Sequence, residues 1–161
     1  MLYISGINYE SIADAEGIAC TIFFSGCKHY CKGCHSKDTW DFNYGKEVTN
    51  DLINTINSEI DKRKFLSALV LSGGDPMYSA SEVLNFVKKI HVPKNNIWCY
   101  SGFKFEDIQK NKEMKALLEV CNVLLDGQFE IEKRDITLLF RGSSNQRIWI
   151  KDKGEWNVVQ T

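Results

Sequence analysis

Three cysteines, Cys27, Cys31 and Cys34, lie within eight consecutive residues of the chain. Three residues separate the first pair and two separate the second. Thiolates so close together on one loop can bind a single soft centre, which in proteins is zinc or an iron–sulfur cluster. The alternative is three unrelated cysteines, buried or on the surface. A [4Fe–4S] cluster bound by three cysteines would leave one iron open to a small molecule.

A zinc site is the main competitor of the cluster. Closed zinc sites take four ligands, usually as two separated cysteine pairs, and the sequence has no second pair. His29 and His35 lie in the same loop, however, so a site of three cysteines and one histidine stays open. The other cysteines, Cys20, Cys99 and Cys121, each stand alone in an apolar run. Disulfides are the weakest interpretation, because half of the thiols cluster in one loop and the sequence shows no secretory signal.

Composition restricts the function further. With 161 residues, 43% of them apolar and 25% charged, the chain suits one globular domain spanning residues 1–161. A net charge of -1 gives no bulk attraction to nucleic acid or to anionic membranes. The N-terminus has no basic and apolar leader, and no stretch approaches the roughly 18 apolar residues of a membrane span. We expect a cytoplasmic protein with neither nucleic acid nor membrane as a partner.

The elements around the cysteine loop follow from periodicity. Residues 2–9 and 18–24 are expected to be extended, and the second run is apolar almost throughout, as in a strand buried on both faces. About 22 residues without clear periodicity follow and carry the three cysteines. Loops of that length inside a compact domain are usually functional.

Strands and helices then alternate. We expect a helix that begins near residue 49, a strand at 68–71, a helix to about Ile90, a strand at 97–100, a helix over 106–120 and a strand at 123–125. Thr49 is the predicted N-cap of the first helix, which buries Leu52, Ile53, Ile56 and Ile60. Ser79 and Glu82 are the predicted capping box of the second helix. Cys121 is expected in the core.

This alternation predicts parallel βα units with right-handed crossovers. Four of the strands end in glycine-containing turns, at 25–26, 72–74, 101–102 and 126–127. Ligands bind at these strand ends in parallel α/β folds, and glycine permits a close approach of backbone to ligand. Asp126 either touches a cofactor or closes its turn. Residues 136–140 and 147–150 are predicted strands around the polar loop 141–146, and 156–159 is a predicted edge strand, which gives an α/β fold with a β-rich C-terminal end.

Three motifs resemble those of radical S-adenosylmethionine enzymes, and in particular of the small activating proteins of anaerobic, class III ribonucleotide reductase. They are the CX3CX2C cysteines, the turn Gly73-Gly74-Asp75-Pro76 and the loop 141–147, and the resemblance covers most of the chain. It implies a partial (β/α) barrel, since the chain is too short for eight βα units. Two positions depart from the wider superfamily: Gly33 replaces a common aromatic residue, and Asp75 replaces the usual Glu.

The resemblance also implies the roles of individual residues. Cys27, Cys31 and Cys34 would bind a [4Fe–4S] cluster and provide the metal site, with no catalytic residue beyond these ligands. The cofactor S-adenosyl-L-methionine would be bound by two groups of residues. Its adenine side would meet Gly33, Cys34 and His35, and its methionine end would meet Gly73, Gly74 and Asp75.

The implied activity is the reductive cleavage of S-adenosylmethionine to methionine and a 5′-deoxyadenosyl radical. That radical would take a hydrogen from a glycine of the large subunit of anaerobic ribonucleoside-triphosphate reductase. An external reductant such as a flavodoxin is the second implied partner, and a homodimer is left open. Alternative functions are the activation of another glycyl-radical enzyme, radical chemistry on a small molecule, and a structural zinc module that binds a protein. A plain electron-transfer protein is disfavoured, because its cluster usually has four cysteine ligands.

Overall fold

The computed structural model describes residues 1–159 and has a mixed α/β fold. Its strands are β1 (Tyr3–Ser11), β2 (Ala19–Phe24), β3 (Lys46–Glu47), β4 (Ala68–Gly73), β5 (Ile97–Tyr100), β6 (Val123–Asp126), β7 (Arg147–Asp152) and β8 (Glu155–Val158). Its α-helices are α1 (Asn50–Asp61), α2 (Ala80–Val87), α3 (Phe105–Lys110) and α4 (Lys112–Glu119). The predicted α/β class is confirmed. No helix within residues 1–159 has the length and apolar character needed to cross a membrane.

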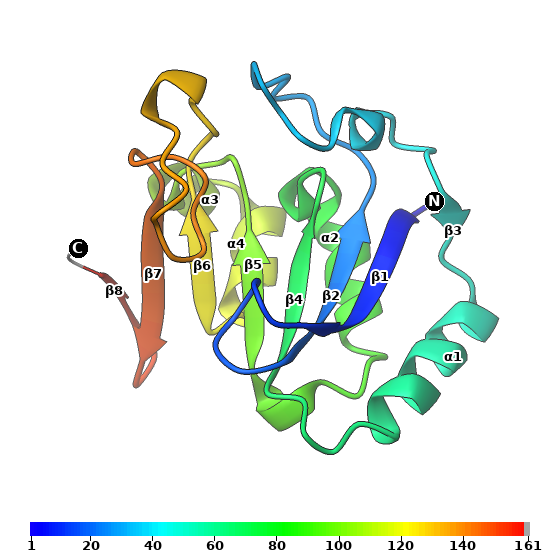
Figure 1. Ribbon diagram of the computed structural model, residues 1–161. Coiled ribbons are helices and arrows are strands. Elements are labelled where there is room, and N and C mark those ends of the chain that lie inside the picture. The colour runs from blue at the N-terminus through cyan, green and yellow to red at the C-terminus, as the bar shows by residue number, and fades with distance from the viewer. Residues whose placement is uncertain (160–161) are drawn as a thin grey trace.

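The strands form one sheet in the order β3-β1-β2-β4-β5-β6-β7-β8 (Figure 1). β2, β4, β5 and β6 are parallel neighbours, as the alternation of strands and helices predicts. β1 and β7 flank them as antiparallel strands, and β8 pairs with β7 at the edge. The carboxyl ends of the four parallel strands therefore meet along one edge of the sheet. The long loop after β2 lies at that edge (Figure 1).

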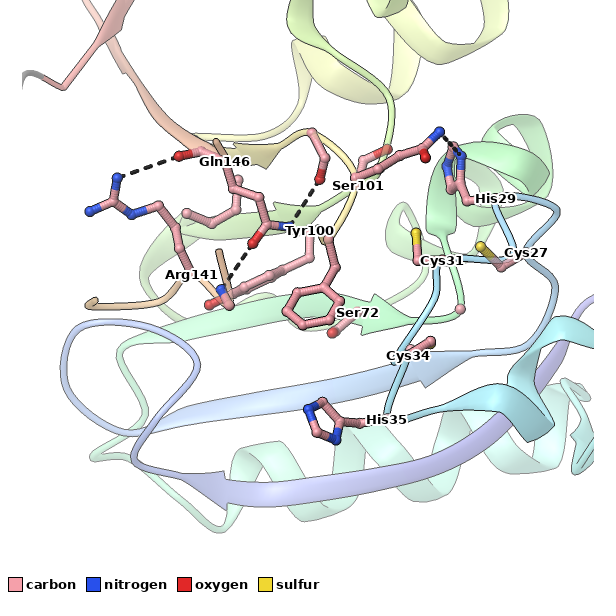
Figure 2. A pocket seen from close by; sticks show the side chains of 18 of the residues that line it. Cys27, His29, Cys31, Cys34, His35, Ser72, Tyr100, Ser101, Arg141 and Gln146 are labelled. Carbon is pink, nitrogen blue, oxygen red and sulfur yellow. Dashed lines mark hydrogen bonds between the residues drawn. The ribbon is translucent and has the colours of Figure 1, made fainter. Parts of the chain in front are cut away.

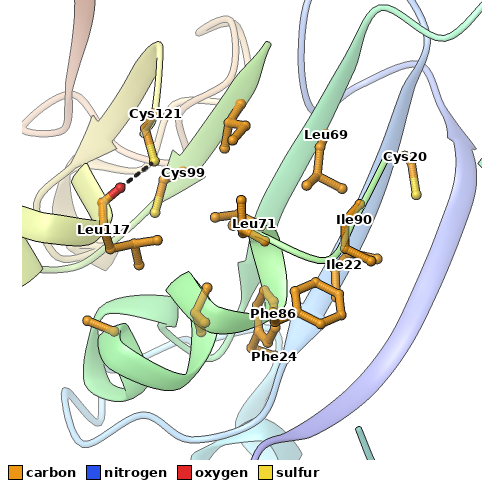
Figure 3. Packing of buried hydrophobic residues seen from close by; sticks show 14 of the residues in the cluster. Cys20, Ile22, Phe24, Leu69, Leu71, Phe86, Ile90, Cys99, Leu117 and Cys121 are labelled. Carbon is orange, nitrogen blue, oxygen red and sulfur yellow. Dashed lines mark hydrogen bonds between the residues drawn. The ribbon is translucent and has the colours of Figure 1, made fainter. Parts of the chain in front are cut away.

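Alternate residues of the parallel strands face opposite sides of the sheet. One side packs against the helices, and Figure 3 shows part of this cluster, in which Ile22, Phe24, Leu69 and Leu71 lie near Phe86. The other side carries a smaller cluster that includes Ala68, Val70, Trp98, Val123 and Leu125, which Phe140 and Ile148 cover in part. Burial on both faces explains why these strands are apolar without alternation in the sequence. Cys20, Cys99 and Cys121 are fully buried, and Cys121 is in the core as predicted.

Side-chain hydrogen bonds cap the N-termini of α1 and α4. Thr49 caps α1 as predicted, because its hydroxyl accepts a hydrogen bond from the Leu52 amide at 3.2 Å. The helix expected over 106–120 is divided into α3 and α4, since Asn111 takes an extended conformation between them. The side chain of Asn111 accepts from the Met114 amide at 3.0 Å and so caps α4.

The predicted Ser79–Glu82 capping box is wrong. Ser79 is the residue before α2, but its side chain makes no capping hydrogen bond. A 3-10 turn, Pro76–Ser79, precedes the helix, and Asp75 caps that turn by accepting from the Met77 amide at 2.9 Å. The helical segment thus starts earlier than expected, and α2 ends at Val87 instead of Ile90.

The predicted strand at residues 136–140 is also wrong. Asp135 accepts hydrogen bonds from the backbone amide of Thr137 at 2.9 Å and from its hydroxyl at 2.5 Å. This local turn competes with strand pairing, and Phe140 has a positive φ of 62° that ends any extended run. The strands predicted at 147–150 and 156–159 are confirmed as β7 and β8.

Candidate metal and cofactor site

A cavity of about 310 Å³ lies at the carboxyl ends of the parallel strands. Its volume falls in the range of roughly 300–1,000 Å³ that is typical of small-molecule sites. In Figure 2 the cysteines lie at one end of it, and Tyr100, Arg141 and Gln146 lie at the other. It is lined by Cys27, His29, Cys31, Cys34, His35, Trp40, Ser72, Gly73, Gly74, Tyr100, Ser101, Gly102, Leu125, Gly127, Gln128, Phe129, Phe140, Arg141, Gly142 and Gln146.

The three cysteines of the long loop all line this cavity, and all three are free thiols. Cys27 is buried, whereas Cys31 and Cys34 are half-buried. Backbone hydrogen bonds shape the loop: the Cys34 amide donates to the Cys31 carbonyl at 3.1 Å, and the Gly26 amide donates to the Thr39 carbonyl at 2.6 Å. The three cysteines that the sequence singles out therefore face one cavity.

The donor set fits an iron–sulfur cluster. In residues 1–159, no three His, Cys, Asp or Glu side chains lie close enough together to hold one metal ion. The cysteines of a [4Fe–4S] cluster bind different iron atoms, so they need to face one cavity without converging on a point. Three thiolates are the soft ligands that iron–sulfur clusters take.

Two of the three thiols, those of Cys27 and Cys31, are held in their protonated form. The pKa of the Cys27 thiol is raised to about 12, chiefly by burial and in smaller part by the Asp75 carboxylate and the other two thiols, although a backbone hydrogen bond at His29 partly lowers it. Burial also raises the pKa of Cys31, although a backbone hydrogen bond at Phe129 partly lowers it. Metal binding at these side chains must therefore displace protons.

The two glycines after β4 meet neighbouring backbone. Gly73 has a φ of +101°, and a Cβ there would collide with the backbone of Phe24 in β2. A Cβ on Gly74 would lie 2.8 Å from the carbonyl oxygens of Gly26 and Thr39. The sequence predicts glycine here for close approach to a ligand. The structure adds a second reason, because both glycines also let the β4 end pack against β2 and the cysteine loop.

Asp75 lies behind the cavity wall. Its carboxylate is 1% exposed and does not line the cavity. One oxygen lies 2.6 Å from Nε2 of His29 and also accepts from the Ser101 hydroxyl at 3.0 Å and the Gly102 amide at 2.8 Å. The His29 ring lines the cavity, and its Nε2 is directed at Asp75.

The remaining predicted residues lie in different places. His35 lines the cavity, with its ring centre 6.2 Å from that of Phe129. Gly33 does not line it; with a φ of +80°, its Cα faces Ile131, which a Cβ would approach to 2.8 Å. Asp126 also lies outside the lining and accepts hydrogen bonds from Arg147 and from the Phe105 amide, so it joins β6 to β7 and to the start of α3.

Several lining residues were missed by the sequence analysis. Tyr100 and Leu125 lie at the ends of β5 and β6, and Gln128 and Phe129 follow β6. Their positions directly at strand ends were the available signal. Gln146 holds the polar loop 141–146 against the same edge, since its side chain donates to the Gly127 carbonyl at 2.9 Å.

Comparisons with known proteins agree with this site. Residues 13–149 match the family model described as a 4Fe-4S single cluster domain. The anaerobic ribonucleoside-triphosphate reductase-activating protein of Salmonella typhimurium LT2 is 36% identical over 140 residues, which cover 84% of this chain and 90% of the relative. The proteins of that name from Escherichia coli K12 and phage T4 are 37% and 35% identical, and cover 84% and 93% of this chain and 90% and 98% of their own lengths. The chain therefore belongs to the family of anaerobic ribonucleoside-triphosphate reductase-activating proteins and carries the 4Fe-4S single cluster domain of the matching family model.

Proposed function

We propose that this protein activates anaerobic ribonucleoside-triphosphate reductase by generating a glycyl radical on its large subunit. The observation that carries the proposal is that three free thiols and three glycine-containing strand ends, those of β4, β5 and β6, line one cavity in a chain of this family. A [4Fe–4S] cluster at the thiols would supply one electron to S-adenosylmethionine, giving methionine and a 5′-deoxyadenosyl radical that takes a hydrogen atom from the glycine.

The chain's own residues would hold the reactants. Cys27, Cys31 and Cys34 would bind the cluster as thiolates, and Cys27 and Cys31 would first lose the protons that burial retains. Because Cys27 is buried behind the other two, it would lie on the protein side of the cluster.

The remaining cavity would hold S-adenosylmethionine. Gly73 and Gly74 present backbone groups to the cavity and would meet the methionine end. Cys34 and His35 would lie on the adenine side, where Phe129 offers an aromatic face. Gly33 and Asp75 do not line the cavity and would support this site from behind.

The size of the cavity supports a macromolecular second substrate. About 310 Å³ suits one small molecule, so a second reactant must approach from outside. The relatives named above are activators of a reductase, and we propose the large subunit of that enzyme as the partner. We further propose one domain with a partial barrel, a cytoplasmic location, and an external reductant such as a flavodoxin.

The test is the formation of the glycyl radical on the reductase subunit. Purified large subunit is mixed anaerobically with this protein, S-adenosylmethionine and a reductant, and the radical is measured by electron paramagnetic resonance. A protein-based radical signal that requires all four components is expected, and replacement of the radical-bearing glycine by alanine in the subunit should abolish it. Cluster-loaded protein that consumes S-adenosylmethionine without ever producing that signal would favour another glycyl-radical enzyme.

A structural zinc module is the second candidate. The three thiols and the ring of His35 line one cavity, which favours a zinc site, but these side chains would have to move closer together to bind a single ion. Metal analysis of protein purified without oxygen separates the two, since a zinc protein is colourless and an iron–sulfur protein is brown. Stoichiometric zinc without iron would overturn the proposed radical chemistry.

A further inference from the structure

A buried pair, His29 and Asp75, joins the cysteine loop to the strand ends. His29 Nε2 lies 2.6 Å from Asp75 Oδ2, and the two side chains are 6% and 1% exposed. We propose that this pair is a tether that sets the position of the cysteine loop, so that both are positioning residues of the metal site. The role at a cluster rests on the proposed function, whereas the tether itself is a property of the protein chain.

Asp75 is fully engaged by protein donors. Its Oδ1 accepts from the Met77 amide at 2.9 Å. Its Oδ2 accepts from the Ser101 hydroxyl at 3.0 Å and the Gly102 amide at 2.8 Å, in addition to His29. An ionised carboxylate has about four acceptor sites, so this set uses its capacity. Asp75 thereby connects the end of β4, the start of the following turn and the residues after β5 to one imidazole.

Neighbouring side chains hold the imidazole of His29 in place. Its ring centre lies 5.0 Å from that of Tyr78 and 4.7 Å from that of Phe103. The amide nitrogen of Gln128 lies 3.1 Å from Nδ1. Because an amide nitrogen only donates, Nδ1 accepts, and the neutral ring carries its hydrogen on Nε2 and donates it to Asp75. The tether therefore has a defined donor and acceptor.

Two features of the cysteine loop, the position of His29 and the backbone conformation of Tyr30, explain why the loop needs such a tether. His29 lies midway between Cys27 and Cys31, so fixing its ring limits where both thiols can lie. The next residue, Tyr30, is 60% exposed and has a φ of +52°, in the left-handed region that bulky side chains disfavour. A conformation of this kind persists only where the surroundings impose it. Burial of the neighbouring His29 ring against Asp75 imposes it here.

The chain offers matched variants. His29→Leu removes the donor to Asp75, whereas His29→Gln keeps an N–H group at nearly the same distance from the backbone as Nε2. Asp75→Asn replaces one carboxylate oxygen by an NH₂ group. In either orientation of the side-chain amide, this NH₂ group faces a group that now donates to Asp75, which is the Met77 amide in one orientation and His29 Nε2 in the other. The control is His91→Leu, which breaks another His–Asp pair: His91 Nδ1 lies 2.9 Å from Asp61, but both side chains are more than half exposed.

Amide hydrogen exchange on the full-length, metal-free protein tests the tether. We expect exchange of amides 27–36 to become about tenfold faster in His29→Leu and Asp75→Asn, with a smaller change in His29→Gln. Exchange in β2 and β4 should stay at the wild-type rate, which shows that the fold is intact, and His91→Leu should change nothing in the loop. Wild-type exchange of the loop in His29→Leu would overturn the tether.

A second readout addresses the metal site. After anaerobic reconstitution, His29→Leu should release iron to a chelator several-fold faster than wild type and show an altered electron paramagnetic resonance spectrum of the reduced cluster, with His29→Gln closer to wild type. An unchanged spectrum and release rate in His29→Leu would overturn the positioning role. Wild-type protein that takes up no iron would overturn the proposed function instead, and the exchange experiment would still decide on the tether.

Discussion

The guanidinium group of Arg147 holds the fully buried carboxylate of Asp126, with Nη2 2.6 Å from Oδ2 and Nε 3.1 Å from Oδ1. Arg147 also donates to both oxygens of Glu106, at 2.9 and 2.8 Å. Asp126 ends β6, Glu106 lies in the first turn of α3 and Arg147 begins β7, so this group of three charges fastens the antiparallel β7 to the parallel part of the sheet. It lies beside the Gly127 and Gln146 side of the cavity.

Loss of Arg147 should destabilise the protein strongly. Arg147→Met leaves the buried Asp126 charge without its partner, and we expect a loss of about 2–3 kcal/mol in the free energy of unfolding. The matched control is Arg63→Met, for which a much smaller loss is expected, because Arg63 pairs with Glu10 and Glu59, which are 56% and 29% exposed. Urea unfolding measures both, and equal losses would contradict a special role of the buried pair.

The same group predicts a pH dependence. Hydrogen bonds from Arg147 lower the pKa of Glu106 from 4.5 to about 2. Because the pKa is lower in the folded state, the stabilisation is complete above about pH 4.5 and is lost as the pH falls towards 2. Glu106→Gln should therefore be less stable than wild type at pH 7, by less than about 1 kcal/mol for this half-exposed side chain. The difference should shrink between pH 4.5 and 3; a difference that widens there would contradict the assignment.

The conformation of Gly73 predicts a sharp cost of adding a methyl group. Gly73→Ala introduces strain at a φ of +101° and a collision with the Phe24 backbone, for which we expect a loss of about 3 kcal/mol or more. Gly6→Ala is the control, because nothing lies within 4 Å of a Cβ placed there. Thermal unfolding compares the two variants. A stable Gly73→Ala protein would show that the close contact between β4 and β2 is not obligatory.

Alanine substitutions of the cysteines should fall into two groups according to the iron content of the reconstituted variants. Alanine at Cys27, Cys31 or Cys34 should reduce the iron and sulfide bound after reconstitution, since each change removes one ligand. Cys121→Ala should keep the full iron content, because Cys121 is buried in the core and its thiol donates to the Leu117 carbonyl at 3.3 Å. Iron loss in Cys121→Ala in a folded protein would contradict the assignment of ligands.

Much of the fold could be predicted, because its elements follow from local patterns. The apolar runs that became β2, β4, β5 and β6 are buried on both faces, and Thr49 caps α1 as its position indicates. Where a local hydrogen bond competes with the pattern, the prediction fails. Asp135 turns the apolar run 136–140 away from a strand, and Asn111 divides one apolar helical face between two helices.

For the candidate site, the sequence predicts that the three cysteines face one cavity, but it predicts only part of the remaining lining. Spacing along the chain brings Cys27, Cys31 and Cys34 to one cavity, because they share a loop. Contacts between segments that lie far apart in the sequence produce no recognisable spacing of residues along the chain. The pairing of His29 with Asp75 spans 46 residues, and both residues suggest a ligand or a cofactor contact when the sequence is considered alone.

The most direct test of the proposed chemistry is the formation of 5′-deoxyadenosine from S-adenosylmethionine. The full-length protein is reconstituted anaerobically with iron and sulfide, reduced with a strong chemical reductant, and assayed with and without the reductase large subunit. We predict product from wild type and from Cys121→Ala, and none from Cys31→Ala. Equal product from Cys31→Ala, or no product from fully loaded wild type even with the large subunit present, would contradict radical chemistry at this cysteine loop.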